Sequence, residues 1–196
     1  MDRDSPQAEV PASSQAEGDC LSTLNRVLSV VSRSRDLHEA LETLTYALLR
    51  LTGAEAVEIH LVSSADKSLV PAAALQKNGA QHPFLDASDA RLAMDAALAE
   101  GRLVFHPLSP DRPSLVDGIT HVVASPIASH SPDGVILLGL KDERSLSQDA
   151  RHLLCVLSLN AALVIDRLRW ERDVEREVAH RDLISDVSTI AVAEDS

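Results

Sequence analysis

Two short segments combine polar, chemically active side chains with the alternation typical of β-strands. In residues 57–61, Glu58 and His60 alternate with valine, isoleucine and leucine, so both polar side chains share one face of a predicted strand. In residues 121–127, His121 and Ser125 share a face by the same alternation. Together these four groups could recognise a small anion or an organic acid. The alternative is that they bond loop backbones or stay half exposed.

The sequence contains none of the common catalytic motifs. No two of its 8 histidines form the HExxH pair of a helical zinc site. It also contains no GxSxG nucleophile elbow, no P-loop and no GxGxxG turn. We therefore expect no metal site and no catalytic residue in this chain.

Composition excludes several other classes of protein. The chain has 196 residues and a formal net charge of −12, which disfavours binding to the nucleic-acid backbone. Its 2 cysteines are too few for a disulfide framework. No apolar run approaches the roughly 20 residues of a membrane span, and the N-terminus lacks the apolar stretch of a signal peptide. We expect a cytoplasmic protein without membrane contact.

The periodicity of apolar residues divides the chain into elements. Residues 1–18 are predicted to be a disordered leader, and residues 19–35 a helix. Asp36 is placed to cap a second helix that Gly53 ends. A short helix is predicted over residues 88–99, and a long one from Ser147 onwards. The predicted strands are residues 57–61, 69–76, 103–105, 121–127 and 135–140.

Apolar residues near both ends predict a dimer. In the first helix they follow a heptad seam, and in the last they continue where the helix becomes strongly charged. The predicted interface residues are Leu21, Leu24, Leu28, Val31, Trp170 and Val174. Two copies would form a four-helix bundle. The alternative is a monomer whose helices cover only its own core.

Three segments, in this order and spacing, resemble the GAF domain family of signalling modules. They are RDLHEALETLTYALLRLTGAEAVEIHLV, AALAEGRLVF and HVVASPIASHSPDGVILLGLKDERSLSQDARHLLCVLSLNAALVIDR. The resemblance implies a GAF-like α+β domain over residues 36–168, followed by a signalling helix and tail over residues 169–196. It further implies an antiparallel sheet of five or six strands, with the first and last helices on one face and a ligand pocket on the other.

The resemblance also limits the possible cofactors, because the family binds cyclic nucleotides, tetrapyrroles, haem, amino acids or nothing. A covalent bilin is disfavoured, since Cys20 precedes the domain and Cys155 is expected to be a buried hydrophobe. Haem ligation by His82, His106 or His121 is disfavoured by an aromatic content of only 2%. The ligand, if there is one, stays unknown at this point.

The same resemblance implies a non-catalytic sensory domain whose paired end helices pass a signal to an output domain, in the same chain or in a partner protein. A structural dimerisation module without a ligand is one alternative. A second arises because EVAHRDLISDVSTIA resembles the phosphoacceptor helix of histidine kinases. His180 would then be the phosphoacceptor and the chain the sensory front end of a longer two-component kinase. Otherwise His180 is a solvated side chain on a charged helix.

Overall fold

The computed structural model describes residues 12–85, 87–109, 114–129 and 132–194. The strands in this part of the chain form one antiparallel sheet of five strands, in the order β2-β1-β5-β4-β3. The strands are β1 (Ala56–Val62), β2 (Leu69–Gln76), β3 (Val104–Pro107), β4 (His121–Ala128) and β5 (Pro132–Leu140). The helices are α1 (Ala12–Arg33), α2 (Leu37–Thr52), α3 (Ala87–Glu100), the short 3-10 helix η1 (Glu143–Ser145) and α4 (Gln148–Glu194).

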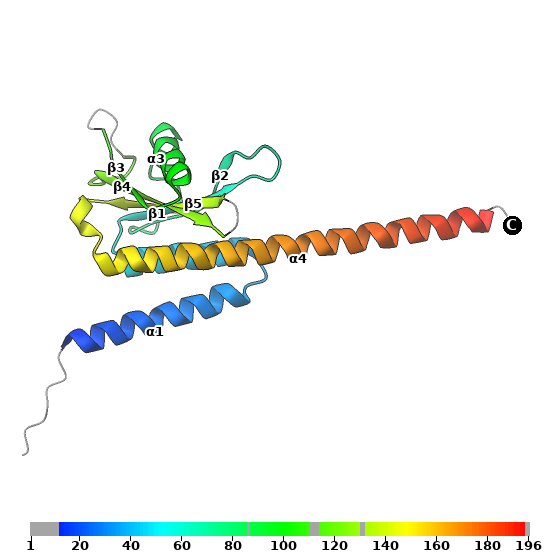
Figure 1. The fold of residues 1–196 in the computed structure, drawn as a ribbon, viewed down its shortest axis with the longest axis horizontal. Coiled ribbons are helices and arrows are strands. Elements are labelled where there is room, and N and C mark those ends of the chain that lie inside the picture. The colour runs from blue at the N-terminus through cyan, green and yellow to red at the C-terminus, as the bar shows by residue number, and fades with distance from the viewer. Residues whose placement is uncertain (1–11, 86, 110–113, 130–131, 195–196) are drawn as a thin grey trace, which may run out of the picture.

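The helices divide between the two faces of the sheet. Helices α2 and α4 pack on one face, with α1 lying outside them, whereas α3 covers the opposite face (Figure 1). The prediction of an α+β fold with the first and last helices on one face is therefore confirmed. None of the described helices is both long and apolar enough to cross a membrane.

The ends of α2 form through the local interactions that the sequence predicts. The Asp36 side chain accepts a hydrogen bond from the backbone N–H of Glu39 at 3.0 Å, which satisfies one free donor of the first turn. Gly53 ends the helix with φ 70°, a left-handed conformation that favours glycine. Helix α1 begins at Ala12, before the predicted start near Asp19, and residues 1–11 of the predicted leader lie outside the described residues.

Strand β1 separates two hydrophobic cores. Val57, Ile59 and Leu61 face the helices α2 and α4 and belong to the larger core. Glu58 and His60 face the other side, where α3 and the loop before it form the smaller core. This is the orientation predicted from their alternation.

The edge strand β2 is irregular opposite β1. Its register shifts between Ile59 and His60, so that Ile59 pairs with Ala73 but His60 pairs with Pro71. Proline is tolerated here because an edge strand has one side without strand partners. The bulge brings Pro71 beside His60 on the face covered by α3.

Candidate functional site

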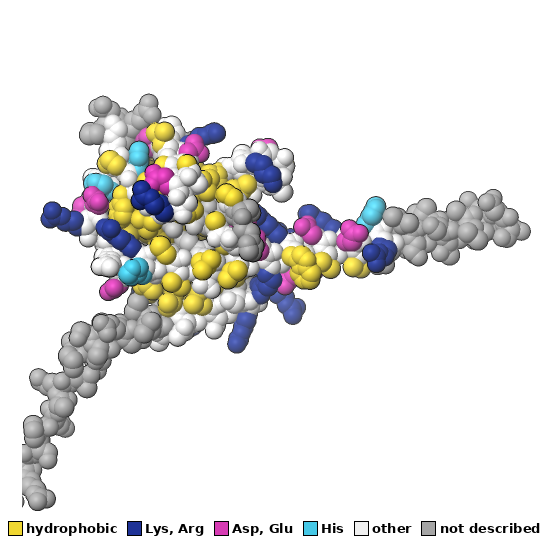
Figure 2. Space-filling view, in the orientation of Figure 1, with side chains coloured by type: hydrophobic (Ala, Val, Ile, Leu, Met, Phe, Trp, Pro, Cys, Tyr) yellow, Lys and Arg dark blue, Asp and Glu magenta, His cyan; other side chains and the backbone are white. Residues whose placement is uncertain are grey.

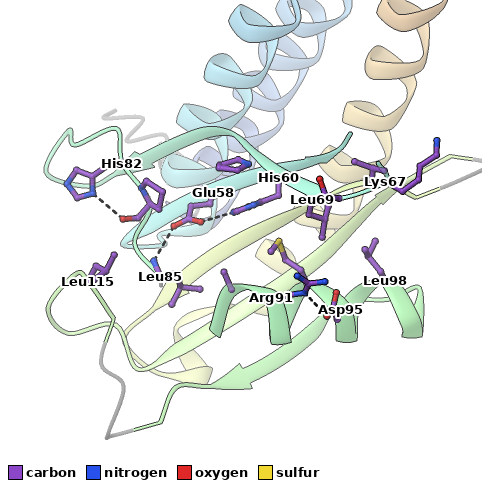
Figure 3. A pocket seen from close by; sticks show the side chains of 16 residues that line it. Glu58, His60, Lys67, Leu69, His82, Leu85, Arg91, Asp95, Leu98 and Leu115 are labelled. Carbon is purple, nitrogen blue, oxygen red and sulfur yellow. Dashed lines mark hydrogen bonds and ion pairs between the residues drawn. The ribbon is translucent and has the colours of Figure 1, made fainter. Parts of the chain in front are cut away.

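A pocket of about 690 Å³ lies between β1, β2, α3 and the loop that leads into α3 (Figure 3). Its walls consist mainly of aliphatic side chains and prolines, with a few charged or imidazole groups. The lining residues are Glu58, His60, Val62, Lys67, Ser68, Leu69, Pro71, His82, Pro83, Leu85, Ala90, Arg91, Met94, Asp95, Leu98 and Leu115. A concave, mostly apolar cavity of this volume is suited to a small-molecule ligand.

A buried acid–imidazole pair forms part of the pocket wall. Glu58 Oε2 lies 2.9 Å from His60 Nε2, and the two residues are only 2% and 7% exposed. Glu58 Oε1 accepts backbone hydrogen bonds from Phe84 and, at 3.3 Å, from Leu85. The carboxyl group therefore fixes the loop that carries one wall of the pocket. His60 Nδ1 is buried and has no hydrogen-bond partner among the residues that the structure describes.

The charged groups of the lining lie around this pair. Arg91 and Asp95 stand one turn apart on α3, with Nε and Oδ2 separated by 3.7 Å. The Lys67 side chain extends away from the other labelled residues (Figure 3). His82 is held by Gln76, whose side-chain nitrogen lies 3.0 Å from His82 Nδ1 and donates to the His82 carbonyl at 3.1 Å. Gln76 was not among the predicted site residues, because its partner His82 lies in a loop without regular periodicity.

His121 and Ser125 do not join Glu58 and His60 in the pocket. The two do share one face of β4, as predicted, but it is the face toward the helices. Ser125 is paired with Ile136 across the sheet and forms a 2.9 Å hydrogen bond with Ser158 of α4. His121 lies at the other end of β4, with Nδ1 2.8 Å from Thr120 Oγ1. The predicted set of four is therefore two separate pairs on opposite faces.

The thiol and imidazole candidates for a cofactor are also dispersed. Cys155 is exposed on α4, so the prediction that it is buried is wrong. The helix α4 covers the sheet face opposite the pocket, which separates this thiol from the cavity. Of His82, His106 and His121, only His82 lines the pocket. Among the described residues, no group of three or more His, Cys, Asp or Glu side chains could hold a metal ion.

Comparison with protein-family models decides the family. The model described as "GAF domain" matches residues 36–167, which is more than half of the chain. The chain belongs to the GAF domain family. The GAF domain is a sensory and regulatory module of signalling proteins, and the expectation drawn from the three sequence segments is confirmed. A comparison with curated proteins finds no match.

Solved structures share this GAF fold at low sequence identity. The GAF domain of an Acinetobacter phosphoenolpyruvate-protein phosphotransferase is 16% identical with a TM-score of 0.62, covering 76% of this chain and 93% of that one. Free methionine-R-sulfoxide reductase from Neisseria meningitidis is 18% identical with a TM-score of 0.60, covering 78% and 91%. Bacteriophytochrome RpBphP3 from R. palustris is 15% identical with a TM-score of 0.63, covering 92% and 44%. At these identities the likeness concerns the fold alone.

The seam predicted in α1 packs inside this GAF chain. Leu24 and Val31 are 9% and 3% exposed and belong to the core under the sheet, and Leu28 packs against it. These side chains are thus buried within the chain and do not form an exposed surface to which a second copy could bind. The side chain of Leu21 lies outside the described residues.

A different apolar surface runs along α4 of the GAF chain. While Leu154, Leu157 and Leu168 face the core, another side of the helix carries exposed apolar side chains. We call this surface the α4 stripe; it consists of Val156, Leu159, Leu163, Trp170, Val174 and Val178. Figure 2 shows apolar side chains among charged ones where α4 leaves the domain. The predicted interface residues Trp170 and Val174 belong to the stripe. Val156, Leu159 and Leu163 were not predicted.

Two of the stripe residues that were not predicted, Leu159 and Leu163, belong to a repeat that is visible in the sequence. Leu159 and Trp170 are 11 residues apart, as are Leu163 and Val174. An 11-residue repeat corresponds to about 3.67 residues per turn, so these side chains follow one nearly straight line along a helix. Farther along α4, His180 is exposed on the charged segment.

Two arginines attach α4 to the GAF domain just before the helix leaves it. Arg167 donates to the carbonyl oxygens of Ser32 and Ser34 at the end of α1. Arg169 donates to Asp133 Oδ1 at 2.8 Å and to the carbonyl of Val62 at 3.1 Å. Burial and the nearby Asp166 raise the pKa of the Asp133 carboxyl, although Arg169 opposes this.

Proposed function

We propose that this chain is a non-catalytic GAF sensory domain that binds a small molecule, dimerises through α4 and passes a change in pocket occupancy to an output domain. The observation that carries the proposal is the position of two features on opposite faces of one thin sheet. A cavity of about 690 Å³ lies on the α3 face, and a helix that outruns the domain lies on the other. The protein would act in the cytoplasm, without nucleic acid or a membrane as partner.

The pocket supports binding, because its polar groups are arranged before any ligand enters. Glu58 is fixed by His60 and by two backbone N–H groups, so little reorganisation is needed on binding. The walls of the pocket come from β1, β2, α3 and three loops. A ligand that contacts several of these elements would alter how they sit relative to each other.

The α4 stripe supports a parallel dimer. From residue 171 to the last described side chains, α4 is exposed wherever burial is described. A helix gains most of its stability from packing, so a long projecting segment is stabilised by a partner helix. A second copy offers the same straight apolar line and the same flanking charges of both signs. Because α1 uses its seam inside the chain, we assign the interface to α4 and no longer to a four-helix bundle.

Arg169 supports communication between the pocket and α4. It bonds the carbonyl of Val62, the last residue of β1 and itself part of the pocket lining. The loop that follows carries Lys67 and Ser68, which also line the pocket. A shift of this pocket wall would therefore act on α4 at the point where the helix leaves the domain.

Native mass spectrometry of the full chain, purified from its own host, tests both parts of the proposal. We expect a dimer that carries a bound small molecule. Leu98→Trp, which fills the pocket, should lose the small molecule and keep the dimer, whereas Leu163→Glu should do the reverse. A monomer with an empty pocket would contradict the proposal.

Two other outcomes would point to the alternatives. A dimer without any bound molecule would favour a structural dimerisation module. Incorporation of phosphate at His180, lost in His180→Gln, would favour the front end of a histidine kinase. Neither alternative is supported by a contact of the described residues.

A further inference from the structure

The pocket has an accessible positive charge at its opening. Arg91 lines the cavity from α3 and its side chain is also exposed to solvent, so it lies where the cavity meets water. Its ion-pair partner among the described residues is Asp95, with Nε 3.7 Å from Oδ2, which is longer than a hydrogen bond. Because exposed pairs of this kind contribute little, the guanidinium group can exchange Asp95 for an oxyanion of a ligand.

The buried polar pair on β1 offers no comparable contact to a charged ligand. Glu58 Oε1 accepts from the backbone N–H groups of Phe84 and Leu85, and Oε2 lies 2.9 Å from His60 Nε2. His60 Nδ1 is covered by other atoms and is not open to a ligand. A charge placed beside this pair would lose hydration without gaining a partner, which is costly. Since Lys67 extends away from the other labelled residues, Arg91 is the favourable position for a negative charge (Figure 3).

The walls behind Arg91 are aliphatic. Leu69 and Pro71 line the cavity from β2, and Met94 and Leu98 line it from α3. None of the 16 described residues that line this pocket is phenylalanine, tyrosine or tryptophan. Flat ring systems are commonly held by stacking on aromatic side chains. These walls therefore suit a flexible hydrocarbon body better than a flat ring.

We infer that the pocket binds an aliphatic carboxylate, with its carboxylate on Arg91 at the opening and its hydrocarbon body between β2 and α3. The inference rests on the proposed function and specifies its ligand class. The planar guanidinium group can donate two parallel hydrogen bonds to a carboxylate, whereas an ammonium on Asp95 would stay strongly hydrated. Asp95 also lines the pocket and would repel the second charge of a phosphate. An organic acid was among the ligands predicted from sequence, although Arg91 was not among the predicted site residues.

Four probes with the same eight-carbon chain test the head group by calorimetry on the full chain at neutral pH. They are octanoate, octan-1-ol, octylammonium and octyl phosphate. Octanoate should bind roughly three- to tenfold more tightly than octan-1-ol, as expected for a partly exposed charged contact. It should also bind at least about threefold more tightly than octylammonium and octyl phosphate. A fifth probe, 1-naphthoate, is a flat aromatic carboxylate and should bind more weakly than octanoate.

Three variants locate the contact at Arg91. Arg91→Gln should abolish the preference for octanoate over octan-1-ol and leave the affinity for octan-1-ol unchanged. Arg102→Gln is the matched control, because Arg102 is an exposed arginine that pairs with Glu100 at the end of α3 and does not line the pocket. This variant should keep the preference. Asp95→Asn should tighten octanoate about two- to threefold, since it removes a neighbouring negative charge.

Met94 reports where the probes bind, without any substitution. The chain has 2 methionines, and Met94 is buried in the α3 wall of the pocket. Its methyl ¹³C resonance should shift with octanoate and with octan-1-ol, because both place their hydrocarbon chain against this wall.

Several results would overturn the inference. These are binding of any other probe as tightly as octanoate, a preference for octanoate that survives Arg91→Gln, a Met94 resonance that does not shift, or no binding of any probe. The proposed function has a separate test, because a molecule of another chemical class found on protein from its own host would preserve it while contradicting this ligand class.

Discussion

Arg169 Nη1 lies 2.8 Å from Asp133 Oδ1, and this pair joins the last helix to the start of β5. Asp133 is only 2% exposed, whereas the arginine side chain is 37% exposed. The second guanidinium nitrogen bonds the carbonyl of Val62 at the end of β1. One side chain thus connects two neighbouring strands to the segment of α4 that leaves the domain.

Replacing Arg169 should destabilise the domain strongly. Arg169→Ala leaves Asp133 buried without its partner, so we expect a loss of about 2–3 kcal/mol in the free energy of unfolding. Arg176→Ala is the matched control, since its pair with Asp173 is exposed and should cost under about 0.5 kcal/mol. Urea unfolding gives both values, and equal losses would show that the buried pair has no special role.

Asp133 should make stability decrease with rising pH. Burial, together with Asp166, raises the pKa of Asp133 above its ordinary value of 3.8, so the native state holds this proton more tightly than the unfolded chain does. The resulting cost is absent below 3.8 and develops as pH rises through the raised pKa. In urea unfolding, the stability of Asp133→Asn minus that of the parent should therefore increase with pH in this window. A constant difference would contradict the prediction.

Glu55 should have the opposite dependence on pH. Burial alone would raise its pKa, but hydrogen bonds to Lys77 at 3.0 Å and Lys141 at 3.3 Å outweigh this and lower it from 4.5. Its contribution is present above 4.5 and is lost as pH falls through the lowered pKa. At pH 7 and low salt, Glu55→Gln should cost about 0.5–1 kcal/mol. The difference should shrink in acid and in high salt, and a difference independent of both would refute the ion pairs.

Two glycines of β5 should differ in their tolerance of alanine. A Cβ on Gly134 would collide with the backbone oxygen of His60 on the paired strand. A Cβ on Gly139 would instead lie 2.6 Å from Ile119 Cδ1, the end of a flexible side chain, and 2.9 Å from Phe84 Cε2. We expect Gly139→Ala to cost about 1–3 kcal/mol and Gly134→Ala more, because a backbone atom cannot rotate away. Thermal unfolding that ranks them in the reverse order would refute this.

Trp170 should report dimerisation, because it is the single tryptophan and is 67% exposed on the α4 stripe. Its fluorescence emission should move to shorter wavelength as protein concentration rises, since pairing of stripes removes the ring from water. Leu159→Glu should abolish the concentration dependence. Leu92→Glu, which replaces an equally exposed leucine on α3, should leave it unchanged. If both variants behave alike, the stripe is not the interface.

The features that local pattern determines were predictable from the sequence. The cap at Asp36, the left-handed Gly53 and the two faces of β1 follow from short-range rules. In β1 the rule succeeds because polar Glu58 and His60 alternate with large aliphatic residues on the face toward α2 and α4.

The features that depend on long-range pairing were not predictable. In β4 the residues on both faces are buried, so alternation groups His121 with Ser125 but does not tell which face they occupy. The register with β5 decides it, by setting Ser125 opposite Ile136. Helix α4 likewise carries apolar residues on two sides, and only its packing tells that Leu154 is buried and Cys155 exposed.

The length of α4 beyond the domain has a mechanical consequence. Residues 170–194 continue the helix, and at a rise of about 1.5 Å per residue they extend roughly 37 Å. A stiff rod of that length works as a lever, so a tilt of about 5° at Arg169 would displace its far end by roughly 3 Å. A tilt too small to disturb the packing of the sheet would thus move the far end of α4 by a distance comparable to the length of a side chain.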